Sequence, residues 1–216
     1  SLTMWDLLIF FLREEWKNKF NIMASLLFIF SAALIAYLSL PSLDSQHFSA
    51  VFWIVVIFTT LQGISKAFLQ MRKQHYLFWH QLYTAQNFLA ARLIQSCILM
   101  LVYTLMALFL FNLFFEIQLH TWTAFTISCI LTGIGISSIF TISSSIASKT
   151  EQPGVLMPVL SFPILLPIIL VGSKAGAKSL QDLEVNVIFA DWGILLCIDT
   201  LIVLMGIFLI KFIWKD

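Results

Sequence analysis

The stretch "EQPGVLMPVLSFPILLPIIL", residues 151–170, is apolar enough to lie in a lipid bilayer and holds four of the chain's five prolines. Proline lacks the N–H that a helix needs, and its ring clashes with the carbonyl four residues earlier. The first proline can begin a helix, whereas Pro158, Pro163 and Pro167 fall inside one. In lipid, freed carbonyls are tolerated only where other groups satisfy them. We therefore expect these prolines, with Gly154, to break or kink a span that neighbouring helices shield.

The rest of the chain is also apolar. Of its 216 residues, 60% are hydrophobic and 11% are charged, whereas a soluble domain is about half apolar and a quarter charged. The apolar residues form long runs almost free of charge, which is typical of membrane spans and leaves no room for a soluble nucleic-acid-binding domain. We predict an all-α integral membrane protein that forms one transmembrane domain. Its six spans are expected at about 22–40, 48–64, 93–115, 121–147, 153–171 and 190–212.

Lysine and arginine fall mainly on one side of these spans. An even number of spans places both termini on the same side, and ten of the twelve Lys and Arg residues lie there. The other side holds only Lys174 and Lys178. Since cytoplasmic loops carry an excess of basic residues, both termini should be cytoplasmic.

Residues 1–20 precede the first span and are expected to form a helix that lies in the membrane interface. Apolar residues recur there at three- and four-residue steps, while Arg13, Glu14 and Lys17 fall largely on the other face. The apolar positions are Leu2, Trp5, Ile9, Leu12, Trp16 and Phe20. A segment that only anchors the first span would show the same pattern, so both interpretations stay open.

The largest cytoplasmic connection, residues 65–92, carries four basic residues, several aromatic residues and no acid. Anionic lipid of the inner leaflet attracts such segments, so a belt bound to lipid is one interpretation. A docking surface for a cytoplasmic partner is the other. The residues predicted to contact such a partner are Lys66, Arg72, Lys73, Tyr76, Trp79, Tyr83 and Arg92.

Two spans carry small or polar residues inside the membrane. In the fourth, Gly133, Ser137, Thr141 and Ser145 recur every four residues. Such a face favours close packing of helices, and a stripe that lines a substrate path is the alternative. In the sixth, Asp199 is a carboxylate well inside the span, where an acid costs about 2.5–3.5 kcal/mol. It should face protein or water, either in a hydrogen bond to another helix or in a role in transport or in contact with a partner.

No motif for catalysis is visible in the chain. The stretch "GSKAGAKS" at 172–179 lacks the second glycine of a Walker A loop, and no strand precedes it, so it does not predict an ATP site. The three cysteines lie far apart within apolar runs, which predicts packing and no metal site. His47 and His120 fall in predicted outer loops. Imidazole can ligate haem iron there, although solvated loop side chains are the simpler interpretation.

The order of these parts resembles the CcmB family, the membrane subunit of a haem-exporter-like ABC complex in cytochrome c maturation. The likeness covers nearly the full length. It includes "FLREEWKNKF" at 11–20, "YLFWHQLYTAQNFLAARL" at 76–93 and, as its most specific part, the run with spaced prolines at 151–172. The resemblance implies a six-span permease of the ABC-2 export type in the bacterial inner membrane.

The resemblance also implies partners. A separate ATPase subunit, CcmA, would bind ATP, and CcmC, CcmD and the chaperone CcmE would handle haem beside the permease. ATP hydrolysis would be tied to release of haem-loaded chaperone, and the basic segment would receive force from the ATPase. Whether haem contacts this chain, and whether two copies form a homodimer, stays open. Two other functions stay open as well: an ABC-2 permease for a drug, lipid or polysaccharide, and a membrane scaffold that transports nothing.

Overall fold

The described part of the chain folds into helices without strands, which confirms the predicted all-α class. The computed structural model describes residues 4–17, 19–40, 45–69, 84–115, 122–148, 150, 152–181 and 185–213. The helices in these ranges are α1 (Met4–Lys17), α2 (Lys19–Ser39), α3 (Ser45–Leu69), α5 (Ala85–Phe115), α6 (Trp122–Ala147), α7 (Pro153–Leu180) and α8 (Val185–Ile213). Six of them, all except α1, are long and apolar enough to cross a membrane.

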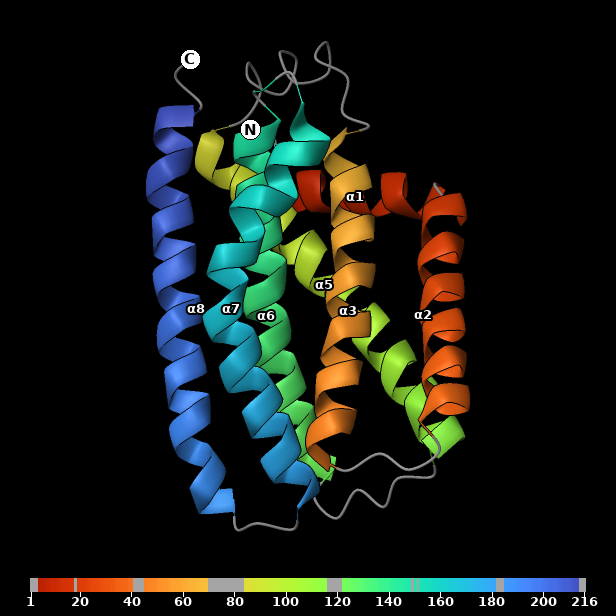
Figure 1. The fold of residues 1–216 in the computed structure, drawn as a ribbon. Coiled ribbons are helices and arrows are strands. Elements are labelled where there is room, and N and C mark those ends of the chain that lie inside the picture. Colours follow the sequence, from red (N-terminus) through yellow and green to blue (C-terminus); the bar gives the residue numbers. More distant parts are fainter. Residues whose placement is uncertain are drawn as a thin grey trace.

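The six long helices form an upright bundle, and α1 lies across one end of it (Figure 1). The last turns of α8 and the first turn of α7 lie at that same end. We call it the α1 end and the opposite end the far end. Helix α5 runs obliquely through the bundle, so that it contacts α1 near its own start and α2, α3 and α6 along its length.

Helix α6 is the centre of the bundle. It packs against α3, α5, α7 and α8, and 67% of its apolar span is buried, against 22% for α2, α7 and α8. Its hydroxyl groups are satisfied by its own backbone: Thr132 and Thr141 each donate to the carbonyl four residues earlier, at 2.8 and 2.7 Å. Bonds within the helix therefore satisfy these buried hydroxyl groups, and Ser128 also accepts a hydrogen bond from Nε1 of Trp192 on α8 at 2.8 Å.

The small-residue face of α6 packs as the sequence predicts. Gly133, Ser137, Thr141 and Ser145 are all buried. A side chain added at Gly133 would lie 3.4 Å from Met100 on α5, and the hydroxyl of Ser137 lies 3.1 Å from the sulfur of Cys97 on the same helix. Removing side-chain bulk lets helices approach closely in lipid, where no hydrophobic effect drives them together.

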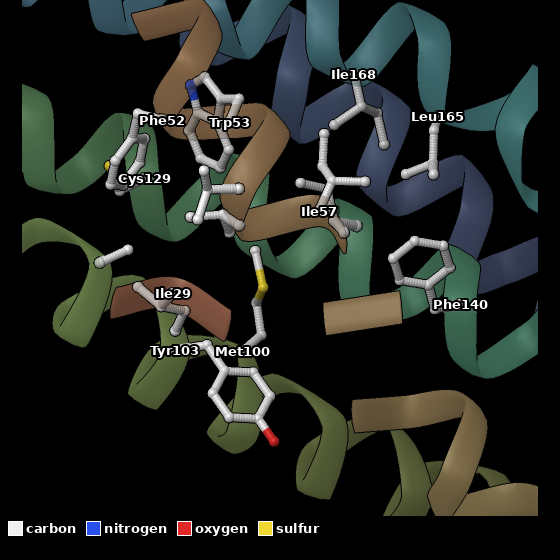
Figure 2. Packing of buried hydrophobic residues seen from close by; sticks show 14 of the residues in the cluster. Ile29, Phe52, Trp53, Ile57, Met100, Tyr103, Cys129, Phe140, Leu165 and Ile168 are labelled. Atoms are coloured by element: carbon white, nitrogen blue, oxygen red, sulfur yellow. The ribbon is translucent and has the colours of Figure 1, made fainter. Parts of the chain in front are cut away.

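The apolar core draws side chains from all six long helices, with Leu195 contributed by α8, and Figure 2 shows part of this core from close by. The labelled residues are Ile29 from α2, Phe52, Trp53 and Ile57 from α3, Met100 and Tyr103 from α5, Cys129 and Phe140 from α6, and Leu165 and Ile168 from α7. Rings gather toward the far end, where Phe52 makes edge contacts with Trp53 and Phe111 at 5.4 and 5.7 Å between centroids. This core fixes α3, α5 and α6 to one another.

The expected break in the fifth span is not present, because α7 continues as one helix through Pro158, Pro163 and Pro167. The kink expected as the alternative stays a prediction. The expected shielding is also wrong for much of this stretch. Pro163, Pro167 and Gly154 are exposed on this chain, and Pro158 is only half-buried. The prolines therefore do not create an interrupted helix inside the bundle.

Packing on the opposite face explains why α7 stays continuous. Met157, Ser161, Leu165 and Ile168 recur at steps of four, four and three residues and are all buried, so a regular helical stripe meets the neighbouring helices α3 and α6. Side chains that pack at helical spacing hold the backbone in a helix even where proline removes a hydrogen bond. The hydroxyl of Ser161 adds a bond of 2.7 Å to the carbonyl of Met157.

The end of α7 beyond the prolines is packed differently. Of its last nine residues, Ser173 and Lys178 are partly exposed and Lys174 is exposed, while the buried positions hold small residues and, at the end, Leu180. A side chain at Gly172 would clash with Thr132, and one at Gly176 would lie 2.8 Å from the hydroxyl of Ser49. These last nine residues of α7 are held closely against α3 and α6 at the far end.

Candidate coupling site at the α1 end

Helix α1 has two apolar faces, and one of them docks on α5. Leu7, Leu8 and Phe11 are buried and form a cluster with Phe88 and Ala91 of α5. The rings of Phe11 and Phe88 meet edge to face, with centroids 5.6 Å apart. The stripe that the sequence places in the membrane interface lies on the other side, where Trp5, Ile9 and Trp16 are 62, 52 and 75% exposed. Helix α1 therefore joins the bundle on one side and offers aromatic residues to the interface on the other.

A buried arginine completes the contact between α1 and α5. The guanidinium carbon of Arg92 lies 3.6 Å from the centroid of the Phe11 ring, and only 2% of the residue is exposed. A cation over the face of an aromatic ring is attracted by the negative charge density there. Arg92 is the eighth residue of α5, so this contact fixes the first turns of α5 to α1.

Four polar side chains from α1, α2 and α5 form a hydrogen-bonded group beside this ring contact. Arg92 donates through Nη1 to Oε1 of Gln95 at 2.7 Å, and Gln95 donates through Nε2 to Oε2 of Glu15 at 3.4 Å. Asn21 donates through Nδ2 to the other oxygen of Glu15 at 3.1 Å. All four residues are buried. We call Phe11, Glu15, Asn21, Arg92 and Gln95 the Glu15 cluster.

The surroundings of Glu15 shift the pKa of its carboxyl group in two opposite directions. Burial raises the pKa of Glu15 above its ordinary value, and the nearby Glu14 raises it further. The hydrogen bond from Asn21 and the positive charge of Arg92 lower it, but not enough to cancel the effect of burial. A carboxylate taken out of water needs donors and a cation nearby, and the Glu15 cluster supplies both.

A tyrosine packs toward α3 where a glycine makes room for it. A side-chain carbon added at Gly63 would lie 2.8 Å from both Cε2 and Oη of Tyr103, which is closer than such atoms approach. Tyr103 is fully buried and projects from α5, so the ring of this residue occupies the space that Gly63 leaves open on α3. This contact joins α3, whose last residues begin segment 65–92, to α5, whose first residues end that segment.

A family model described as "CcmB protein" matches residues 2–211, nearly the whole chain. The chain belongs to the CcmB family. Members of this family are the membrane permease subunits of the haem-exporting ABC complex for cytochrome c maturation. A search of curated proteins returned no significant match. Membership of the CcmB family makes the chain a multi-pass membrane protein that is not itself catalytic.

The residues expected to contact an ATPase in a CcmB-family chain are placed only in part. Arg72, Lys73, Tyr76, Trp79 and Tyr83 lie outside the described residues. Lys66 falls in the last turns of α3, and its side chain is outside the described part as well. Arg92 is the exception, and its position corrects the prediction. Because Arg92 is buried over Phe11, it holds α5 to α1 and offers no charge to a cytoplasmic protein.

The two histidines considered as haem ligands are not brought together by the described structure. His47 is exposed in the first turn of α3, at the far end, and His120 lies outside the described residues. Among the residues that the structure does describe, no group of three His, Cys, Asp or Glu side chains could hold a metal ion.

Asp199 lies apart from the Glu15 cluster, fourteen residues from either end of α8. It is 5% exposed, and neither carboxylate oxygen has a hydrogen-bond partner among the described residues. Gly135 on α6 makes room for it, since a side chain there would clash with Oδ1 of Asp199. The other buried acid of α8, Asp191, forms an ion pair of 2.6 Å with Lys178 of α7.

The sequence did not indicate Phe11, Glu15, Asn21 or Gln95 as members of a site. The signal present in the sequence is a second apolar stripe in α1, in which Leu7, Leu8 and Phe11 share the helical face of Glu15. An acid on an apolar face predicts a buried partner, and Arg92, the last residue of segment 65–92, is the cation that lies near it.

Proposed function

We propose that this CcmB-family chain couples ATP hydrolysis on a separate CcmA-like ATPase to haem handling at the outer side of the bacterial inner membrane. In this proposal both termini and the α1 end face the cytoplasm, in agreement with the ten basic residues expected on that side. The partner subunit binds ATP. Proteins like CcmC, CcmD and CcmE handle haem, and His47 at the far end is the described residue available for haem contact.

The Glu15 cluster is the observation that supports coupling. Segment 65–92 is the proposed contact with the ATPase, and the first described residues after its central part begin α5. Arg92 and Gln95 attach that part of α5 to α1 and, through Glu15 and Asn21, to the start of α2. A force applied to the segment therefore acts on three helices together.

The packing of the bundle supports a route for such a movement to the far end. Helix α5 contacts α6, and α6 contacts both α7 and α8. Because close-packed interiors are hard to compress, helices that are packed in this way shift as units. The proposal is that ATP binding and hydrolysis move α1, α2 and α5 against α6, α7 and α8, and that the far end releases haem-loaded chaperone in response.

Reconstitution of the whole complex in lipid tests the proposal with two changes at the α1 end. The double variant Arg72→Glu, Lys73→Glu reverses charge in the proposed ATPase contact and should weaken ATPase binding. The variant Gln95→Leu removes the bridge between Arg92 and Glu15 inside the membrane domain. It should leave the ATPase bound and active while the amount of chaperone released per ATP hydrolysed falls.

Two matched variants control for charge and for loss of a polar group. Lys174→Glu reverses an exposed charge at the far end, and Asn112→Leu removes an exposed amide from the far half of α5. Both should leave coupling unchanged. If the double variant at Arg72 and Lys73 binds the ATPase and releases chaperone as the unaltered chain does, the coupling proposal is wrong. If Gln95→Leu alone behaves as unaltered, the Glu15 cluster has no part in it.

A further inference from the structure

We infer that the groove between α6 and α8 is a docking site for a transmembrane helix of a different membrane subunit, and that Asp199 accepts a hydrogen bond from a donor side chain of that helix. The groove is lined by Leu131 and Ile134 of α6 and by Leu196, Asp199, Thr200, Val203 and Leu204 of α8. We call these seven residues the Asp199 groove. The inference concerns the lateral face of the bundle and does not depend on how the α1 end is coupled to an ATPase.

The position of Asp199 is the first observation. It lies at the middle of a 29-residue helix whose other residues are mainly apolar, so in a bilayer it lies near the centre of the hydrocarbon. A carboxyl group is costly there unless protein or water satisfies it. Both oxygens are buried and have no hydrogen-bond partner among the described residues. The described bundle therefore leaves a strong acceptor unsatisfied at the depth where an unsatisfied acceptor is most costly.

The groups around Asp199 do not offer it a donor. The hydroxyl of the adjacent Thr200 donates to the carbonyl of Leu196 at 2.7 Å, and Ser137 on α6 bonds to the carbonyl of Ile134 and lies beside the sulfur of Cys97. On the third side, Gly135 and Ile168 close the space behind the carboxyl group. The side that remains is the groove, whose other lining residues are almost all apolar.

The shape of the groove suits part of a helix. It has a volume of about 320 Å³ and opens on the lipid-facing surface, where Leu196 and Leu204 are 53 and 58% exposed. This volume is enough for a few side chains and too small for a second buried helix. A helix lying along α6 and α8 would insert one or two residues, as ridges of side chains do when helices pack. Lipid tails could fill the same space, but they carry no hydrogen-bond donor.

The charge of the site favours a different chain over a second copy of this one. Among the described residues, Lys and Arg side chains lie in α1 or toward the ends of the spans, and Arg92 is buried in the Glu15 cluster. None lies at the depth of Asp199 on a lipid-facing surface. A buried carboxylate is satisfied best by a positively charged side chain that also donates a hydrogen bond. The partner is therefore a helix that carries Lys or Arg near its middle.

Photo-crosslinking within membranes that contain all subunits of the complex tests this inference. A photoreactive phenylalanine analogue is placed at Leu204, in the groove, or at Leu201, which is 61% exposed on the other side of α8. Leu204 should form an adduct with a membrane subunit, and mass spectrometry should place the adduct within one helical turn of a donor residue in a transmembrane helix. Leu201 should not form that adduct.

The role of Asp199 is tested by Asp199→Leu in the same experiment. Loss of the hydrogen bond should reduce the Leu204 adduct about threefold or more, the effect typical of such bonds between membrane helices. Asp199→Asn keeps the size of the side chain and its ability to accept a hydrogen bond, so it should reduce the Leu204 adduct less than Asp199→Leu does. It replaces Asp199→Leu in the experiment if that variant does not fold. Equal adducts from Leu201 and Leu204, an adduct only with a second copy, or no protein adduct from Leu204 would each overturn the docking site. An adduct that Asp199→Leu leaves unchanged would overturn the role of the acid.

Discussion

Glu15 and Asp199 are two buried carboxyl groups in the same bundle with opposite surroundings. Glu15 receives hydrogen bonds from Asn21 and Gln95 and lies near the positive charge of Arg92. Asp199 is buried to a similar degree, yet no described residue donates to it. Since a buried acid without partners is costly, the comparison separates two kinds of role. Glu15 holds this chain together, whereas Asp199 is an acceptor that the chain does not satisfy alone.

The largest expected effect on the stability of the chain comes from a substitution of Arg92. Arg92→Leu removes the cation and the donor to Gln95, and leaves Glu15 buried without its positive neighbour. Removing one member of a buried charged pair costs about 3–5 kcal/mol. The free energy of unfolding of the purified chain in detergent should fall by an amount of that order. Arg13→Leu, which removes an exposed cation from α1, is the control and should change it little. A fall of similar size in both variants would contradict the assignment.

The space beside Asp199 can be closed by Gly135→Ala. The added methyl group would meet Oδ1 of Asp199 and lie 2.6 Å from Cδ1 of Ile168. Overpacking of this kind costs about 1–3 kcal/mol, so thermal unfolding in detergent should begin at a lower temperature. Gly193→Ala adds the same methyl group to α8 where nothing lies within 4 Å. It should leave the transition unchanged or raise it slightly, because alanine favours a helix more than glycine does.

Asp199→Leu sharpens the comparison because stability and assembly should change in opposite directions. In the isolated chain it removes an unsatisfied acceptor and should raise the free energy of unfolding by about 1 kcal/mol. In the complete complex it should weaken retention of the partner subunit during purification. Glu15→Leu provides the contrast, since it leaves the donors of Asn21 and Gln95 unsatisfied and should lower stability. Two variants that both lower the stability of the isolated chain would remove the distinction between the two acids.

The smallest expected effect is the dependence of stability on pH that Glu15 contributes. Because burial raises its pKa, the folded chain binds the proton more tightly than the unfolded chain. The stabilising contribution is therefore complete below the ordinary glutamate pKa of about 4.3 and is lost as pH rises through the raised value in the folded state. Glu15→Gln should flatten the slope of unfolding free energy against pH above that ordinary value. An unchanged slope would show that Glu15 is solvated.

The bundle itself could be predicted from the sequence, since each apolar run is long enough to span a bilayer by itself. The ends of the runs were less certain. The fifth span was expected at 153–171, and the helix that contains it extends to Leu180. Gly172 and Gly176 fit closely against α6 and α3 there, in a way that no local pattern reveals. The small-residue face of α6 was predictable because its period matches the helix and needs no knowledge of the partner.

Two predictions were wrong for a shared physical reason. A break was one of the two outcomes expected of the prolines in α7, and Arg92 was expected on the cytoplasmic surface. Both expectations treat a residue by its own chemistry, whereas packing decides the outcome: the stripe from Met157 to Ile168 keeps α7 helical, and the ring of Phe11 draws Arg92 into the bundle. The contact between Arg92 and Phe11 joins residues far apart in the chain. A single sequence carries little information about such pairs.

The first and last turns of α7 are packed differently, and this difference determines where that helix can tilt. Its last turns are wedged by Gly172 and Gly176 against α6 and α3, while Val155 and Val159 near its start are 63 and 62% exposed. The helix is packed along its length but most closely at its last turns, so its first turns can move farther. Any tilt of α7 therefore pivots about the far end and displaces the start of the helix most.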